Sequence, residues 1–262
     1  MRSKNNLLST KAKTAALLLL CCFATLPSAV NAQKSEADIL ALFYDQANGQ
    51  SWTNKWNITD KTVCNSKSYP GVTCNDSNKI TEIDLHENKL EGKVTPWIYA
   101  LTELTKLELS NNEIDSGGWD QIDDVKGAKL GFALGTKLES IILSNNKISS
   151  LEGIDSLGNT LQELHLTYNR IAGSMPNELF SLNKLKILSI SENEITGKID
   201  TRLGTLTDLT ELYCYGNKLK GHIPQEIGLL TKLQTLTVSI DNFVWVQLNE
   251  LIMGRPPPPK HF

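Results

Sequence analysis

The chain has 262 residues, with 26 Lys and Arg against 29 Asp and Glu, which gives a formal net charge of −3 at neutral pH. Hydrophobic residues make up 40% of the chain, enough for a sizeable core. Because nucleic acids and anionic lipids attract basic proteins, this acidic balance argues against nucleic-acid and membrane-surface binding.

Residues 1–32 are predicted to be a secretory signal peptide. Four positively charged residues precede an apolar run around 15–24, and small residues lead to a cleavage point after Ala32. A membrane anchor is the alternative, but the run is shorter than the roughly 20 residues that a bilayer span needs. Cleavage would remove four positive and no negative charges, so the net charge of −3 would become −7. We therefore expect a secreted, extracellular mature chain that does not insert into a membrane.

Residues 33–79 are predicted to form a cap that contains one helix. Apolar residues recur at helical spacing over 37–47, and Ser35 before them is a suitable N-cap. The same region carries two sequons for N-glycosylation, at Asn57 and Asn75. In a secreted glycoprotein both would be candidate glycan acceptors.

The five cysteines fall into three groups. Two of them leave with the signal peptide. Cys64 and Cys74 form a close pair, and in an oxidising compartment we expect them to form a disulfide bond. Cys214 stands at a leucine position of a repeat, so we expect an inert, buried thiol.

Residues 80–243 consist of repeats, which we number 1 to 7 from their starts at 80, 104, 138, 161, 185, 209 and 233. The three starting at Leu161, Leu185 and Leu209 are the most regular, and each fits the 24-residue frame LxxLxLxxNxLxGxIPxxLxxLxx. Repeat 2 is longer because of an insertion at 115–137, whose role the sequence does not define, and repeat 3 lacks the G-x-I-P half. A fixed period of this length predicts a solenoid.

The frame has physical reasons. Side chains along a strand point alternately to its two faces, so both leucines of L-x-L point inward and the residue between them points outward. The strands of stacked repeats then form a parallel sheet. The Asn of each frame offers two donors and an acceptor for the backbone of its own turn and its neighbour's (Asn169, Asn193 and Asn217). The Gly suits a tight bend. The later apolar positions are expected to face back into the core (Leu179, Leu182, Leu203, Leu206, Ile227 and Leu230).

With its G-x-I-P half, this frame resembles the plant-type extracellular class of leucine-rich repeat proteins, which includes receptor-like protein ectodomains and polygalacturonase-inhibitor-like proteins. The cap is similar to the one that precedes such repeats, and the residues that match it are Trp52, Trp56, Cys64, Gly71, Val72 and Cys74. Tyr69 stands where that cap usually has a Trp. The resemblance implies an α/β repeat fold: a right-handed, curved solenoid with a parallel β-sheet on its concave face and a helical N-terminal cap.

The concave face of the later repeats brings together a predicted ligand-binding patch, formed by His165, Tyr168, Glu192, Tyr213 and Tyr215. Aromatic side chains on a rigid sheet are good contact residues. The alternative is that exposed Tyr and Ser are simply good strand formers. Equivalent positions of successive repeats on this face are rich in serine, and these serines are expected to be mostly exposed to solvent. The first repeats are acidic on this face (Glu82, Asp84, Glu87 and Glu108).

No catalytic motif is present, and the four histidines fall on different repeats or in the tail, so we expect no enzyme activity, metal site or cofactor. Residues 244–262 are an apolar segment and a Pro-rich tail, which either covers the last repeat or continues into a longer protein. The resemblance implies a secreted, non-catalytic recognition module that binds a protein, peptide or glycan through its concave face, with a co-receptor or the cell wall as further candidate partners. The alternatives are a cell-wall or extracellular-matrix structural or adhesion protein, and an ectodomain fragment of a receptor-like signalling protein.

Overall fold

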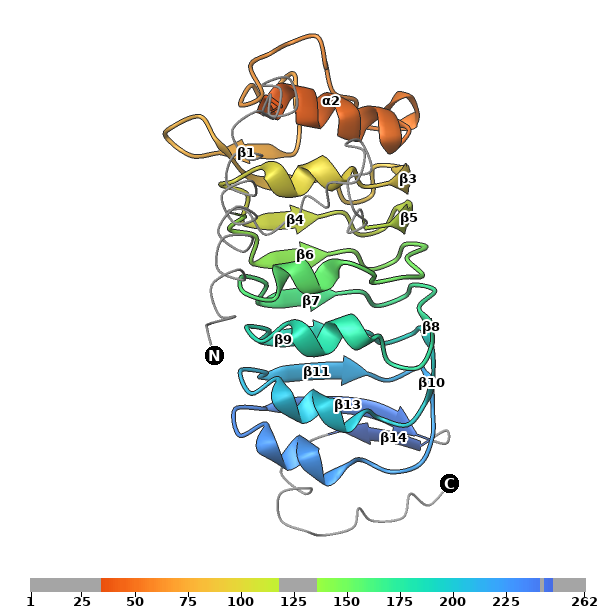
Figure 1. Cartoon of the computed structure of the whole chain (residues 1–262). Coiled ribbons are helices and arrows are strands. Elements are labelled where there is room, and N and C mark those ends of the chain that lie inside the picture. The colour runs from red at the N-terminus through yellow and green to blue at the C-terminus, as the bar shows by residue number, and fades with distance from the viewer. Residues whose placement is uncertain (1–33, 118–135, 241–242, 247–262) are drawn as a thin grey trace, which may run out of the picture. The chain divides into compact units, whose positions relative to one another are not determined.

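The computed structural model describes residues 34–117, 136–240 and 243–246. The predicted signal peptide, most of the 115–137 insertion and the Pro-rich tail lie outside the described residues. The repeats stack in chain order, each forming one coil of the solenoid, with one short strand of each coil in a common sheet (Figure 1). The predicted solenoid with a helical cap is therefore confirmed.

The cap begins with helix α2 (Glu36–Gln46). As predicted, Ser35 is its N-cap, and the Ser35 hydroxyl accepts a hydrogen bond from the Asp38 amide at 3.2 Å. The buried face of α2 and the short 3-10 helix η1 (Gly49–Ser51) enclose Trp52, whose ring meets that of Phe43 edge to face with centroids 5.8 Å apart. This aromatic cluster covers the apolar end of the first coil. Among the described helices, none is long and apolar enough to cross a bilayer.

The predicted disulfide between Cys64 and Cys74 is confirmed, with the two Cα atoms 5.8 Å apart. It ties the cap loop to strand β1 (Val72–Cys74), which pairs with the first repeat. Tyr69, which lies between the two cysteines in the sequence, is fully buried. Its ring packs against Trp56 at 5.6 Å, and its hydroxyl donates to the Asp60 carbonyl at 2.7 Å. Tyrosine can therefore fill a position where tryptophan is usual, because both its ring and its hydroxyl are satisfied.

The main sheet has nine strands in the order β1-β2-β4-β6-β7-β9-β11-β13-β14. The strands from β2 to β13 are parallel, and each end of the sheet is closed by one antiparallel strand, β1 or β14. Equivalent leucines pair across neighbouring strands, as in Leu164, Leu188 and Leu212. Side chains at equivalent repeat positions therefore lie in rows across the sheet. The remaining strands are β2 (Ile80–Asp84), β4 (Lys106–Glu108), β6 (Ser140–Ile142), β7 (Glu163–His165), β9 (Ile187–Ser189), β11 (Glu211–Cys214), β13 (Thr235–Ile240) and β14 (Phe243–Val246).

Shorter parallel ladders follow the main sheet. One joins β3 (Glu91–Lys93) to β5 (Glu113–Ser116), and the other has the order β12-β10-β8, formed by Lys218–Leu219, Glu194–Gly197 and Ala172–Gly173. Within the described residues, repeat 3 adds no strand to either ladder, although its backbone bonds both neighbouring coils there, through Lys147 to Ile114 and through Ile148 to Arg170. The opposite side of the stack carries 3-10 helices: η2 (Pro96–Ala100), η3 (Ile154–Leu157), η4 (Asn177–Ser181), η5 (Thr201–Thr205) and η6 (Gln225–Leu229). The six apolar side chains that were predicted to return to the core on this side are buried.

The repeated asparagines form a ladder through the stack. Asn193 donates from Nδ2 to the carbonyls of Leu166, Ile190 and Ser191 at 2.9, 3.2 and 3.0 Å, and its Oδ1 accepts from the Ile171 amide at 3.0 Å. Each of these asparagines therefore joins its own turn to the preceding coil, as predicted. The ladder extends into the cap, where the Asn54 amide donates to Asn88 Oδ1.

Cys214 is fully buried in β11, as predicted from its leucine position. Burial away from water raises the pKa of its thiol to about 12, because the thiolate would lose its solvation. A thiol that stays protonated is a poor nucleophile, so Cys214 acts as an apolar core residue.

Candidate binding surface on the sheet

We define the sheet face as the outward-facing residues of strands β2 to β13 together with the two residues that follow the last inward leucine of each strand. It corresponds to the face that was predicted to be concave. The structure places His165 and Tyr213 in one row of this face, with Ser189 between them. Tyr215 lies two residues beyond Tyr213 on the same coil. The predicted patch therefore spans three successive coils, which begin at 161, 185 and 209.

Tyr168 and Glu192 occupy a turn that is left-handed in each of the first six coils. Their φ angles are +56° and +51°, and the equivalent residues of coils 2 and 3 are asparagines with φ of +56° and +55°. Asn tolerates this conformation better than Tyr or Glu does. The left-handed conformation of Tyr168 therefore costs stability. Such a cost suggests that the Tyr168 side chain has a role outside the core.

Neighbouring turns of the patch lie in direct contact. The Tyr168 amide donates to the Ser191 carbonyl at 3.1 Å, and the Glu192 amide donates to the Tyr215 carbonyl at 2.8 Å. The Glu192 carboxylate extends over Gly216 of the next coil, where a Cβ atom would collide with it. Glu192 is therefore held beside Tyr215 by its backbone and by the space that a glycine leaves open.

The patch is less exposed than its sequence suggests. Only Tyr168 is strongly exposed, at 53%, while His165, Glu192, Tyr213 and Tyr215 are half-buried. The Tyr213 hydroxyl donates to the Glu211 carboxylate at 2.7 Å, which holds the ring against the sheet.

The expectation that the serine-rich positions on this face are mostly solvated is wrong for the later repeats, whereas Ser110 and Ser144 of the earlier repeats are half-buried. Ser189, Ser191 and Ser239 are all buried. Ser189 shares a 2.6 Å hydrogen bond with Thr167, and Ser239 accepts from the Gly216 amide at 2.9 Å.

Ser191 differs from the other two serines. It is 1% exposed, and its hydroxyl has no hydrogen-bond partner among the described residues. Buried hydroxyls are normally paired, so an unpaired one in the middle of a patch needs an explanation. A ligand group that displaced a neighbouring side chain would give Ser191 its missing partner.

His165 is neutral at neutral pH. Burial lowers its pKa, since the charged ring would lose solvation, and this effect exceeds the opposite influence of Glu163, Glu108 and Glu211. A neutral ring has one nitrogen free to accept a hydrogen bond.

This lowered pKa predicts a pH dependence of stability. Below the ordinary value of 6.5 the unfolded chain binds a proton at His165 that the folded chain resists, so the contribution of His165 is complete above that pH and is lost as the pH falls. We expect the wild type to lose more unfolding free energy than His165→Ser between about pH 7.5 and about pH 5.5 in urea titrations. Equal losses in the two proteins would contradict the assignment. Serine is a matched replacement because Ser189 holds the same position in the next coil.

The sheet face is strongly acidic. Among the described residues it carries seven carboxylates and one lysine, Lys106, which pairs with Glu82 at 2.8 Å. Asp84 lies 2.6 Å from His86 Nδ1, and this contact raises the pKa of His86. In the described parts of the chain, the other five carboxylates form no ion pair. The seven carboxylates are Glu82, Asp84, Glu87, Glu108, Glu163, Glu192 and Glu211.

The two predicted glycosylation sites lie in the cap, away from the sheet face. Asn57 is exposed in the cap, and its Oδ1 accepts from the Thr59 hydroxyl at 2.7 Å. Asn75 is half-buried, and its Oδ1 accepts from the amides of Ser77 and Lys79. Glycosylation at both stays a prediction. No group of three metal-ligating side chains was found in the part of the chain that the structure describes.

Comparisons with known proteins agree with this architecture. Family models described as "Leucine rich repeat" match residues 159–219 and 100–118. The chain is 35% identical over 124 residues to an Arabidopsis thaliana homolog of the protein phosphatase 1 regulatory inhibitor subunit PPP1R7, and 26% identical over 134 residues to Receptor-like protein 32 of the same plant. Each match covers 42% of this chain, but only 37% and 15% of those two proteins.

Solved structures give the same result over more of the chain. The Arabidopsis receptor kinase HAESA, in complex with the peptide hormone IDA and the co-receptor SERK1, superposes on 78% of this chain with a TM-score of 0.63 and 26% identity. This chain covers 33% of HAESA in that structure. The coil register, the asparagine ladder, the disulfide-closed cap and these similarities lead to one conclusion: the chain folds as a leucine-rich repeat solenoid that is similar to plant receptor ectodomains.

Proposed function

We propose that this protein is a secreted, non-catalytic recognition module that binds a basic extracellular peptide or protein segment across the sheet face. The observation that carries the proposal is the patch itself: exposed Tyr168 on a strained turn, beside a buried Ser191 hydroxyl without a partner, within a face of seven carboxylates. Exposed aromatics in rigid surroundings are typical anchors of protein interfaces. The peptide in the HAESA complex supports a peptide as the kind of partner.

The mechanism would be docking onto a rigid surface. Tyr168 and Tyr215 offer aromatic contact area at a small cost in side-chain entropy. Glu192 lies beside Tyr215 and Glu211 beside Tyr213, and both carboxylates would pair with Lys or Arg of the partner. The neutral ring of His165 would accept a hydrogen bond from a backbone amide. No step of this mechanism requires a bond to be made or broken.

The extracellular location has separate support. The N-terminal segment has the pattern of a signal peptide, and Cys64 and Cys74 form a disulfide, which persists in oxidising compartments. One curated relative is a receptor-like protein, whereas the other is a phosphatase regulator. Protein recovered from the medium of a eukaryotic secretory host would begin at Gln33 if the leader is cleaved as predicted.

The binding surface can be removed without disturbing the coils. Each tyrosine of the patch has a smaller counterpart at the same position of another coil, so Tyr168→Asn, Tyr213→Thr and Tyr215→Ser copy Asn145, Thr237 and Ser239. The triple variant should fold as the wild type does, because these residues already occupy equivalent sites. The secreted wild type would be used to select binders from a display library of random short peptides, and the triple variant would then be tested against them.

We expect the selected peptides to be rich in Lys and Arg and to bind the triple variant at least about tenfold more weakly, a difference of roughly 1.4 kcal/mol. Binding should also weaken with added salt. The proposal fails if no peptide family is enriched, if the selected peptides carry no excess of basic residues, or if wild type and variant bind them equally. Thermal unfolding of both proteins would establish that the variant is folded.

A further inference from the structure

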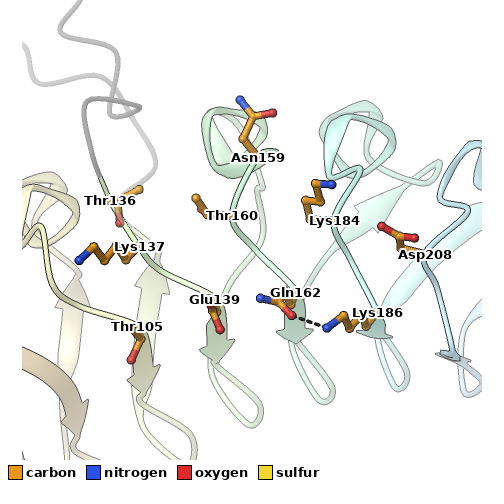
Figure 2. Close-up of a pocket in the computed structure, with 10 residues that line it drawn as sticks. All are labelled: Thr105, Thr136, Lys137, Glu139, Asn159, Thr160, Gln162, Lys184, Lys186 and Asp208. Carbon is orange, nitrogen blue, oxygen red and sulfur yellow. Dashed lines mark hydrogen bonds between the residues drawn. The ribbon is translucent and has the colours of Figure 1, made fainter.

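A hollow lies away from the sheet face, along the edge where the strands begin (Figure 2). It is a polar trough of about 540 Å³ that crosses the coils from Thr105, before β4, to Asp208, before β11. Its lining consists of hydroxyl, amide and charged side chains, and none of the lining residues is aromatic. An apolar ligand would therefore gain little here, whereas a hydroxylated one would find several partners.

The trough coincides with an irregularity in repeat 3. Three residues, Gly158 to Thr160, connect the last core leucine of that coil to the first leucine of the next strand, whereas the following coils use two. Gly158 packs so closely against the Ser181 carbonyl that a Cβ atom would collide with it. The additional residue, Asn159, is exposed and lines the trough (Figure 2).

Lysines at this edge are normally neutralised by the preceding coil. Lys137 pairs with Glu103 at 2.7 Å, and Lys232 pairs with Asp208 at 2.6 Å. All four residues hold the same position, immediately before the first leucine of a coil. Lysine and carboxylate thus alternate from coil to coil and cancel each other's charge.

Lys184 holds this same position, but the preceding coil presents Thr160 to it. Two residues further on, Lys186 donates to the Gln162 side-chain oxygen at 2.6 Å, which is a neutral partner (Figure 2). Within the described ranges, neither lysine has a carboxylate at salt-bridge distance. Asp208 pairs with Lys232, and the more distant charges of Lys184 and Lys186 contribute to lowering the pKa of Asp208. The trough therefore contains two ammonium groups that form no ion pair within the described residues, on a protein that is acidic as a whole.

We propose that this trough binds an acidic saccharide, with its carboxylate or sulfate between Lys184 and Lys186. Asn159, Thr160 and Gln162 would hydrogen-bond the hydroxyl groups of the sugar. Glu139, which also lines the trough, would accept hydrogen bonds from hydroxyl groups further along the ligand. The site lies on a different surface from the tyrosine patch, so it does not depend on the function proposed above.

The test measures binding of glucuronate, glucose and acetate to the secreted protein by calorimetry at constant ionic strength. Lys184→Gln with Lys186→Gln removes the cations. Thr160→Glu keeps both lysines and restores the carboxylate that other coils supply, so it should close the site by internal pairing. Lys218→Gln is the control, because Lys218 is a surface lysine outside the trough that pairs with Glu194.

We expect glucuronate to bind saturably and several-fold more tightly than acetate, and glucose to bind weakly. The affinity for glucuronate should fall about tenfold or more in the lysine double variant and in Thr160→Glu, and should stay within about twofold in the control. The proposal is overturned if glucuronate does not saturate, if acetate binds as tightly, or if Thr160→Glu binds like the wild type. Because Thr160→Glu adds an ion pair at the surface, its loss of binding cannot be attributed to unfolding if its melting temperature is unchanged or higher.

Discussion

Leu188→Ala is expected to lower the free energy of unfolding by about 2–5 kcal/mol. Leu188 lies in β9, is fully buried, and is flanked in register by Leu164 and Leu212 of the neighbouring coils. Truncation removes apolar surface and leaves a cavity that the backbone on either side cannot close, since each strand is held by the next. Urea unfolding followed by circular dichroism would measure the loss, and an unchanged m-value would show that the same unit unfolds.

Leu229→Ala is the matched control. Leu229 is a leucine of the same stack, but it is 60% exposed on η6. Its truncation should change the unfolding free energy by no more than about 0.5 kcal/mol. If Leu188→Ala were as mild as this, the coil register described above would be incorrect.

Asn193→Ala is expected to destabilise the protein by about 2–4 kcal/mol, although the substitution removes no large apolar group. The Asn193 side chain satisfies three carbonyls and one amide from two coils. Alanine would leave the buried Ile171 amide without its partner, at a cost of roughly 1–3 kcal/mol before the structure relaxes. It would also remove one hydrogen bond from each of the three carbonyls, which keep donors from Asn169, Asn217 and Tyr168. The same urea titration would measure the change.

Asn183→Ala removes the same chemical group from an exposed corner, and its side chain makes no hydrogen bond within the described residues. It should be neutral to within about 0.5 kcal/mol. Equal effects at the two positions would mean that the ladder contributes little. An Asn193→Ala protein as stable as the wild type would contradict the ladder outright.

Much of the fold could be predicted from residue patterns alone. The spacing of leucines such as Leu164 and Leu188 identified the buried side of every strand, because inward and outward side chains alternate along a strand. Ser35 marked the start of the helix, and Cys64 and Cys74 the disulfide. These features depend on local geometry and on contacts that recur at a fixed period, so one repeat contains the information for the next.

The properties of the candidate sites depended on the tertiary structure. Tyr168 and Tyr213 look alike in the sequence, yet one projects into solvent while the other lies along the sheet and donates to Glu211. Ser191 is buried because of its neighbours in adjacent coils, which a repeat pattern does not describe. The trough could have been suspected only from the additional residue before Leu161. Whether Lys184 is paired was decided by which side chain the preceding coil presents to it.

The sequence by itself thus determined the solenoid, its register and its cap, since these follow from a regular pattern of burial and backbone hydrogen bonding. The structure alone decided which outward side chains are exposed, paired or left without a partner. Those properties depend on contacts between non-equivalent side chains of different coils, and the positions that depart from the repeat, Tyr168, Ser191, Thr160 and Lys184, are where the two candidate binding sites lie.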